Sequence, residues 1–275
     1  MKTQHILYVI CFLFLFSCAE KKTNKKEPKT ENPIQLRVAS YNVEVSRNAT
    51  ALEIGEALKS YDFDVVSFSE APGGDWTTQV ANVLGMEHVV VGKYSTAGHE
   101  DKYKTIASKT PLYGVEEILM ADTLHTVTKA MTKIGTKEFG LYSVHFPFGW
   151  RDQAHIDETT GKVTSFVDYL KEISEAEIPI VMGDFNFKPS NMDQSNDYHE
   201  LFVGLGLDVH WKELGIDPTK ENTHNALKPE DEGNGEVIDH IMYNRQTFKA
   251  LEGGILPMEK PLSDHKAVWA VLELK

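Results

Sequence analysis

Four short segments, far apart in the chain, place carboxylate, carboxamide or imidazole side chains directly after an apolar run. Oxygens of the first two kinds are the ligands that hard divalent cations prefer, and a sheet can gather such strand ends into one site. The pattern therefore predicts one hard-cation site, of the kind that serves phosphoester hydrolysis. The four segments are Ala39-Ser40-Tyr41-Asn42, Phe68-Ser69-Glu70, Gly183-Asp184-Phe185-Asn186 and Ser263-Asp264-His265.

The first two segments supply candidate ligands for this cation. Side chains two apart on a strand share a face, so Asn42 and Glu44 are expected to point to the same site. Glu70 leaves a largely apolar run, where an ionised carboxylate needs a partner, and Mg²⁺ is a natural one. The plainer alternatives are that Asn42 caps a turn and that Glu70 is a solvated acid at a strand end.

The later segments supply candidate groups for proton transfer. Asp184 and Asn186 again lie two apart, and Gly183 before them would let the backbone come close to a ligand. A loop turn built from these polar residues is the alternative. Asp239 with His265 is a physically sensible pair, because a carboxylate on one imidazole nitrogen fixes the tautomer and raises the basicity of the other.

The N-terminus has the layout of an export signal. Residues 1–17 contain a basic start and an apolar run, and Cys18 follows directly. The segment resembles a bacterial lipoprotein signal peptide, which predicts that Cys18 becomes the lipid-bearing N-terminus; a plain secretory signal with an incidental cysteine is the alternative. Residues 18–32 are polar and predict a flexible tether. After cleavage Cys18 is the sole cysteine, so the mature chain has no internal disulfide.

Residues 33–275 have the size of one catalytic domain, and 41% of the whole chain is hydrophobic, as in an ordinary globular protein. The formal net charge is −13. A protein that binds long nucleic acid without sequence preference usually has a basic surface, so this charge weighs against a general nuclease. Acidity could equally serve solubility alone, and a local basic patch could escape a whole-chain count.

Hydrophobic periodicity predicts an α+β fold with two stacked, mixed and mostly antiparallel sheets covered by helices; a doubly wound parallel sheet is the competitor. Residues 217–236 are polar and rich in Pro, Gly and Asn, which predicts a loop. The expected strands are Gln35–Asn42, Asp64–Phe68, Glu87–Val91, Thr105–Ser108, Thr126–Ile134, Glu138–Phe146, Ile178–Met182, Val237–Tyr243 and Ala267–Leu274. The expected helices are Ala51–Ser60, Trp76–Leu84 and Asp152–Glu175.

Taken together, these motifs resemble the endonuclease/exonuclease/phosphatase superfamily, from about Leu36 to Leu274. The resemblance implies a four-layer α/β/β/α sandwich. It departs from the family pattern at Ser69, where relatives usually carry Gln before the metal-binding glutamate. The resemblance implies metal binding for Asn42, Glu70 and Asp264, water activation for Asp184 and His265, and orientation of that histidine by Asp239. It also implies phosphate binding for Asn186, and for His145 either phosphate binding or protonation of the leaving group.

These observations predict a divalent-metal-dependent hydrolase of phosphodiester or phosphomonoester bonds in an extracytoplasmic substrate, anchored to the cell envelope through lipidated Cys18. Mg²⁺ is the favoured cofactor, with Mn²⁺ or Ca²⁺ as substitutes, because the candidate ligands are rich in oxygen. A nuclease is the rival, and an inactive envelope binding protein is the alternative of another class. No protein partner is predicted.

Several other polar residues receive a weaker interpretation. His240 would face away from the site and is expected to be structural. Four basic residues could flank the phosphate, although a solvated charge is the favoured interpretation for each: Lys102, Lys104, Lys109 and Arg151. No role is predicted for His99, His125, His210 or His224.

Overall fold

The structure is a computed structural model that describes residues 33–148, 152–173, 177–188, 197–228, 230 and 236–275. Residues Pro33–Lys275 form one compact unit. The predicted signal peptide and tether lie outside the described residues, so both stay predictions. Within the described ranges, no helix combines the length and the apolar composition needed to cross a bilayer.

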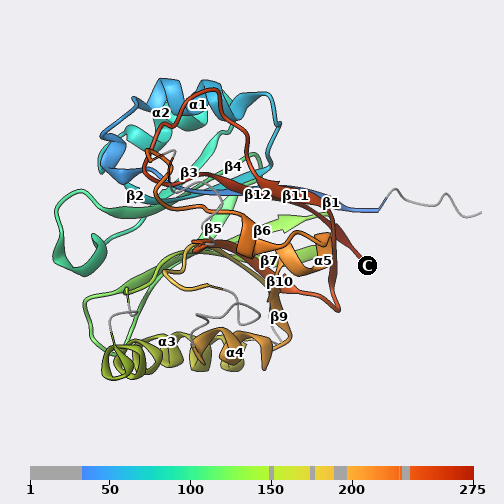
Figure 1. Ribbon diagram of the computed structural model, residues 1–275. Coiled ribbons are helices and arrows are strands. Elements are labelled where there is room, and N and C mark those ends of the chain that lie inside the picture. Colours follow the sequence, from blue (N-terminus) through green and yellow to red (C-terminus); the bar gives the residue numbers. More distant parts are fainter. Residues whose placement is uncertain (1–32, 149–151, 174–176, 189–196, 229, 231–235) are drawn as a thin grey trace, which may run out of the picture. The chain divides into compact units, whose positions relative to one another are not determined.

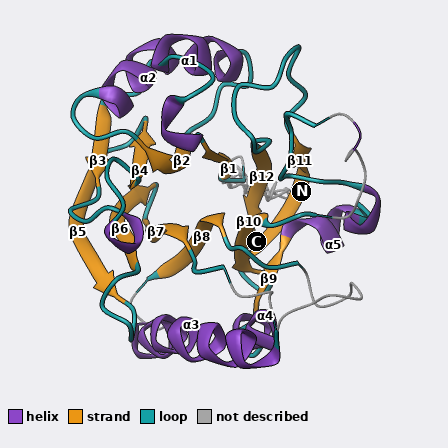
Figure 2. Ribbon diagram, turned by 60° about the vertical axis from the view of Figure 1, so that its left-hand side comes forward, coloured by secondary structure: helices purple, strands orange, loops and turns teal. Residues whose placement is uncertain are grey.

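The strands of the described chain form two six-stranded sheets that face each other (Figures 1 and 2). Their bounds are β1 (Gln35–Asn42), β2 (Val65–Ala71), β3 (His88–Val91), β4 (Tyr103–Ser108), β5 (Leu112–Leu119), β6 (Thr126–Ile134), β7 (Lys137–His145), β8 (Ile178–Asp184), β9 (Leu207–Val209), β10 (Asp239–Asn244), β11 (Phe248–Ile255) and β12 (Val268–Leu274). The first sheet has the order β11-β12-β1-β2-β4-β3 and the second has the order β5-β6-β7-β8-β10-β9.

Helices cover the outer face of each sheet, and Figure 1 shows α1 and α2 over the first sheet and α3 and α4 along the second. The helices are α1 (Ala51–Lys59), α2 (Trp76–Leu84), α3 (Gln153–Ile173), α4 (Asp197–Val203) and α5 (His210–Leu214), with short 3₁₀ turns η1 (Glu44–Ser46), η2 (Thr96–Gly98) and η3 (Pro218–Lys220). The predicted α/β/β/α sandwich is therefore confirmed, and a doubly wound parallel sheet is excluded.

Each sheet contains one parallel pair, β1 with β2 and β7 with β8, while the other strand pairs described are antiparallel. A parallel pair needs a crossover, which here contains α1 in the first sheet and α3 in the second. A capping box starts α1, in which the Thr50 hydroxyl accepts from Glu53 N–H and the Glu53 carboxylate accepts from Thr50 N–H. The local sequence therefore fixes the residue at which α1, the helix of this crossover, begins.

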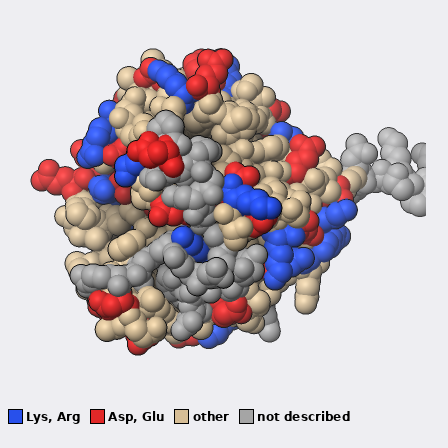
Figure 3. Space-filling view, viewed as in Figure 1, with Lys and Arg blue, Asp and Glu red and all other residues tan. Residues whose placement is uncertain are grey.

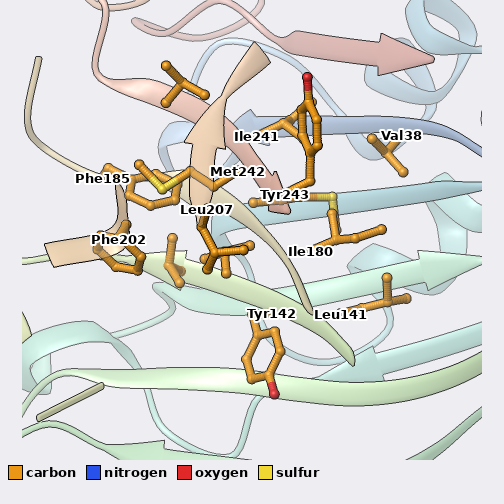
Figure 4. Close-up of a cluster of buried hydrophobic side chains, with 14 of the residues drawn as sticks. Val38, Leu141, Tyr142, Ile180, Phe185, Phe202, Leu207, Ile241, Met242 and Tyr243 are labelled. Carbon is orange, nitrogen blue, oxygen red and sulfur yellow. The ribbon is translucent and has the colours of Figure 1, made fainter. Parts of the chain in front are cut away.

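The main hydrophobic core fills the space between the sheets, and Figure 4 shows side chains from both, among them Val38 of β1 and Leu141 of β7. A second cluster lies between the first sheet and α1 and α2, and Ala39 and Tyr41 of β1 belong to it. Period-2 alternation therefore sends neighbouring β1 residues into different clusters. Both faces of this strand are buried, because helices cover its outer face.

The element predictions succeeded where the apolar pattern is regular. Gln35–Asn42 and Thr126–Ile134 have the predicted bounds, and the described part of residues 217–236 contains no α-helix or strand, only 3₁₀ residues and an isolated bridge. No element was predicted for β5, β9, β11, α4 or α5. β5 carries Gly114 at a positive φ and a register shift, and β11 has a register shift between Ala250 and Glu252. These irregularities hide the alternation that marks a strand.

Two buried histidines that are not among the predicted site residues give the fold an expected acid sensitivity. His210 and His240 are both fully buried, and burial lowers the pKa of each to about 3. In the unfolded chain these imidazoles titrate near pH 6.5, so between pH 6.5 and 3 the unfolded state binds more protons. The contribution of these neutral imidazoles to the free energy of unfolding is fully present above pH 6.5 and is lost as the pH falls toward 3.

We expect His210→Leu to reduce this acid sensitivity, because it removes one of the two protons taken up on unfolding. The slope of unfolding free energy against pH should fall by up to about 1.4 kcal/mol per pH unit between pH 6 and about 4. Urea unfolding across this range measures the slope. His99→Leu, a change at an exposed histidine, is the control. Equal slopes for His210→Leu and the unmodified protein would contradict the explanation.

Candidate active site

The two parallel strand pairs bring four of the predicted site residues to one edge of the sandwich. Asn42 ends β1 and pairs in register with Ser69, next to Glu70 in β2. His145 ends β7 and pairs in register with Asp184, the last residue of β8. Because the carboxyl ends of parallel strands lie at the same edge, both sheets present their polar residues there.

A hydrogen bond joins the two sheets at this edge. The Asn42 carboxamide Nδ2 donates to Asp184 Oδ2 over 3.0 Å, and both side chains are almost completely buried. Asp184 Oδ1 accepts from the backbone N–H of Asn186 over 2.9 Å. The carboxamide of Asn186 in turn donates to the Phe146 carbonyl. Two groups therefore hold the Asp184 carboxylate in one orientation: the Asn42 carboxamide of β1 and the N–H of Asn186, whose own side chain bonds to Phe146.

The antiparallel neighbours β10 and β12 begin at the same edge and bring in the histidine. Asp239 starts β10 directly opposite Asp184. His265 lies shortly before β12, and its Nδ1 is 2.8 Å from Asp239 Oδ2. Because this carboxylate accepts the Nδ1 proton, we assign Nε2 as the nitrogen that faces Asn42, at 3.5 Å, and Asp184 Oδ2, at 3.7 Å. The predicted Asp239–His265 pair is thus present.

Burial and charge shift the pKa values of this group. Burial alone would lower the pKa of His265, but the Asp239 and Asp184 carboxylates outweigh it and raise the pKa to about 10. Burial raises the pKa of the Asp184 carboxyl, an effect that the His265 charge opposes. The two groups lie close enough to share a proton. Without a bound cation His265 is therefore protonated, and it can accept a proton from a water molecule only after it has released this one.

Glu70, near the end of β2, forms an ion pair with a lysine. Its Oε2 is 2.7 Å from Lys102 Nζ, and its Oε1 is 3.7 Å from His145 Nε2. A register shift in the β2–β4 pairing and a φ of +50° turn Glu70 out of the regular strand. Burial, with the Lys104 charge near it, lowers the pKa of His145 well below its ordinary value, so this imidazole is neutral.

These side chains surround a cavity of about 430 Å³. Two of the predicted residues do not line the cavity but bond to residues that do: Asn42 bonds to Asp184, and Asp239 bonds to His265. The cavity is lined by Glu70, His145, Phe148, Asp184, Asn186, His224, Glu236, Ile238, Asp264 and His265. All eight predicted site residues therefore lie in or directly against one neighbourhood, although their chemical roles stay predictions.

The donor set suits a hard cation, because Glu70 and Asp264 offer carboxylate oxygens to the cavity, and behind them the carboxamide oxygen of Asn42 accepts from the backbone N–H of Glu44 and keeps a second lone pair. Glu70 now has the Lys102 ammonium as its counter-charge, so a bound cation would have to replace that contact. Two groups of three His, Asp or Glu residues in the described chain bring their potential ligand atoms within 4.8 Å of one another: Asp184–Asp239–His265 and His224–Asp264–His265.

Some weaker expectations were wrong. Glu44 does not join the site, because the strand ends at Asn42 and the Glu44 carboxylate contacts Arg47 and Asn48 instead. Lys104 is not a solvated charge: its side chain is fully buried, and burial lowers its pKa to about 8. Lys102 was also misjudged, since it pairs with Glu70 inside the site.

Other residues behave as predicted or lie elsewhere. His240 is structural: its Nδ1 accepts from Trp211 Nε1 and its Nε2 donates to the Phe187 carbonyl. Lys109 pairs with Asp62 over 2.7 Å. Arg151 lies outside the described residues. His224, for which no role was predicted, lines the cavity. A histidine within a polar loop carries no periodic signal that could have revealed this position.

Gly183 has a packing role, and the predicted approach of its backbone to a ligand stays a prediction. Its φ is +153°, and a Cβ atom built there would overlap the Val144 carbonyl oxygen of the neighbouring strand β7. The absence of a side chain therefore lets β7 and β8 pair closely, which sets the distance between His145 and Asp184.

We expect Gly183→Ala to destabilise the fold by about 2 to 3 kcal/mol, because the methyl group must push backbone away from backbone. It should also lower any hydrolytic rate, since it displaces Asp184. Gly161→Ala is the matched control: it lies within α3, and its Cβ would meet no atom within 4 Å, so it should be neutral or slightly stabilising. Urea unfolding measures both. Equal stabilities for the two variants would argue against this role.

With this geometry established, the class of protein follows. The chain belongs to the Endonuclease/Exonuclease/phosphatase family, whose model matches residues 39–265. Members of this family are hydrolases that act on phosphoester bonds. The match spans all the predicted site residues, from Asn42 to His265. No curated protein matches the chain significantly in sequence.

Solved structures confirm the fold. An endonuclease/exonuclease/phosphatase from Beutenbergia cavernae is 17% identical with a TM-score of 0.70, over 87% of this chain and 72% of that chain. A family protein from Bacteroides thetaiotaomicron is 17% identical with a TM-score of 0.66, over 89% of this chain and 100% of that chain. TDP2 from D. rerio, complexed with a single-strand DNA product, is 16% identical with a TM-score of 0.64, over 86% and 98%.

Proposed function

We propose that this protein is a divalent-metal-dependent phosphoesterase that hydrolyses phosphodiester or phosphomonoester bonds of an extracytoplasmic substrate. The observation that carries the proposal is the chain of contacts Asp239–His265–Asp184–Asn42, whose members Asp184 and His265 line the same cavity as Glu70. The first group can activate water, and Glu70 can hold positive charge. Hydrolysis of a phosphate ester needs both.

The residues have the following proposed roles. Glu70, Asn42 and Asp264 would hold a Mg²⁺ ion, for which Mn²⁺ or Ca²⁺ could substitute, and which would offset the charge of the phosphate and of the leaving oxygen. Asp184 and His265 orient the attacking water and take its proton. Asp239 keeps the His265 tautomer and stabilises the imidazolium.

The remaining polar residues hold the substrate. Asn186 lines the cavity beside Asp184, and neutral His145 lines it beside Glu70. Both can donate hydrogen bonds to non-bridging phosphate oxygens. Lys102 now pairs with Glu70. Once a cation replaces Lys102 at the Glu70 carboxylate, the lysine ammonium would bind the phosphate group of the substrate.

Turnover of bis-p-nitrophenyl phosphate tests the activity, with and without Mg²⁺. We expect p-nitrophenol release that requires Mg²⁺ or Mn²⁺ and stops when EDTA removes the metal. Asp184→Asn is the matched inactive variant. No release with either metal would favour the alternative of an inactive envelope binding protein.

A nuclease is the second candidate, and the likeness to TDP2 bound to a DNA product favours it. The net charge of −13 opposes it. On the face shown in Figure 3, basic and acidic side chains are interspersed, apart from a group of basic residues near the C-terminus. A panel of single-stranded and duplex DNA, sphingomyelin, inositol phosphates and glycerophosphodiesters separates these substrates. Preferred cleavage of DNA would replace the first proposal by the second.

We further propose that the mature chain begins at a lipidated Cys18, which anchors it to the cell envelope. The supporting observation is the signal-like sequence of residues 1–17 followed by this cysteine. Detergent phase partitioning tests it: the protein should enter the detergent phase, and Cys18→Ser should move it to the aqueous phase. A protein that partitions to the aqueous phase without the substitution contradicts the anchor.

A further inference from the structure

A second carboxylate–imidazole pair faces the cavity beside the one already described. His224 Nδ1 is 3.3 Å from Glu236 Oε2, as His265 Nδ1 is 2.8 Å from Asp239 Oδ2. The two imidazole rings lie 5.0 Å apart between centroids. In each pair the carboxylate holds one ring nitrogen, which leaves Nε2 as the nitrogen available to another ligand.

The backbone fixes this position. His224 pairs with His265 in an isolated antiparallel bridge, Lys266 N–H donates to the Thr223 carbonyl, and Ala226 N–H donates to the Asp264 carbonyl. On its other side, the His224 N–H donates to the backbone carbonyl of Glu236. The segment that carries His224 is therefore bonded to both neighbouring segments of the site.

Three potential metal ligands meet at this point. His224, Asp264 and His265 each offer one ligand atom, and these atoms lie within 4.8 Å of one another. Asp264 and His224 are partly exposed and line the cavity, so a cation can reach them. Two imidazoles and one carboxylate form a donor set that suits Zn²⁺ or Co²⁺ and leaves a fourth tetrahedral position for water. Mg²⁺ prefers oxygen ligands, so its affinity for this site should be low.

We propose that His224, Asp264 and His265 form a transition-metal site, which shares Asp264 with the oxygen-rich site at Glu70 and whose occupation blocks the catalytic imidazole. A bound Zn²⁺ ion takes the His265 lone pair that would otherwise accept the proton of the attacking water. It also engages Asp264, which the proposed Mg²⁺ site needs. Zn²⁺ therefore inhibits the enzyme that Mg²⁺ activates. The blocking effect rests on the proposed function, whereas the metal site itself does not.

Metal binding to the full chain tests the site without any reference to turnover. Calorimetry with Zn²⁺ should show one tight site, and Co²⁺ should give the visible absorption bands of tetrahedral coordination. His224→Asn should weaken Zn²⁺ binding by about 100-fold or more and abolish the bands. Glu236→Gln, which only removes the partner of His224, should weaken it by about tenfold. His99→Asn, at an exposed histidine, should change neither.

Two outcomes would overturn the site: Zn²⁺ affinity in His224→Asn equal to that of the unmodified protein, or Co²⁺ spectra without tetrahedral bands. Should His224→Asn fail to fold, the Glu236→Gln result decides, since an unchanged affinity there contradicts the arrangement.

The blocking effect has its own readout. Zn²⁺ should inhibit Mg²⁺-supported hydrolysis of bis-p-nitrophenyl phosphate in the unmodified protein, and His224→Asn should require about 100-fold more Zn²⁺ for the same fractional inhibition. Zn²⁺ binding without inhibition would retain the site and overturn the blocking. Absence of hydrolysis with Mg²⁺ in the unmodified protein would contradict the proposed function and leave the binding result intact.

Discussion

His265→Ala should lower the kcat for bis-p-nitrophenyl phosphate by about 10³-fold, while the affinity for Mg²⁺ changes little. The imidazole is held by Asp239 at 2.8 Å and shares the neighbourhood of Asp184, so its loss removes the group that accepts the proton of the attacking water. A positioned general base contributes about 10² to 10⁴ in rate. The proposed cation ligands stay in place, which is why metal binding should survive.

Two measurements on this variant separate catalysis from metal binding. Steady-state kinetics gives the loss in kcat, and calorimetry gives the Mg²⁺ affinity. His99→Ala, at an exposed position, should leave both unchanged. A kcat for His265→Ala within a few-fold of the unmodified protein would contradict the role of this histidine, and a large loss of Mg²⁺ affinity would make it a metal ligand instead.

Glu70→Gln should have the opposite signature, with Mg²⁺ affinity lowered by at least about 100-fold and little hydrolysis at ordinary Mg²⁺ concentrations. The substitution keeps the shape of the side chain and removes the negative charge that a divalent cation needs. It also removes the partner of Lys102, whose ammonium then lies at the cation position without its counter-charge and repels the metal further.

Glu44→Gln is the matched control for this prediction. Glu44 follows the same strand end as Asn42, but its carboxylate contacts Arg47 and Asn48 outside the cavity. We expect its Mg²⁺ affinity, measured by calorimetry, to equal that of the unmodified protein. Equal affinities for Glu70→Gln and Glu44→Gln would remove Glu70 from the metal site.

Sequence reasoning located the site because strand ends are visible in the sequence. Asn42, Glu70 and Asp184 each follow a run of apolar residues that must be a buried strand, and the change to polar residues marks the edge of the sheet. The pairing of Asp239 with His265 was also predictable, because an imidazole that acts as a base needs a carboxylate partner. The strand ends use only local sequence and general chemistry, whereas the choice of Asp239 as the partner also rests on the resemblance to the family.

The features that were missed depend on contacts between distant segments. A side chain at Gly183 would overlap the Val144 carbonyl of a neighbouring strand, and no residue near Gly183 in the sequence indicates this contact. Lys102 reaches Glu70 only because β2 and β4 pair with a register shift. His224 reaches the cavity through a loop whose position is set by backbone bonds to two other segments. Periodicity carries no information of this kind.

The central claim is that Glu70, Asn42 and Asp264 hold one hard divalent cation opposite the Asp184–His265 pair. Crystals of the protein grown with Mn²⁺, measured for anomalous scattering, test it most directly. We expect an anomalous peak within coordinating distance of the Glu70 carboxylate, with Lys102 displaced from that carboxylate and Asn42 and Asp264 close to the ion. A fully occupied Mn²⁺ ion that lies away from Glu70, with the Lys102–Glu70 ion pair intact, would contradict the account.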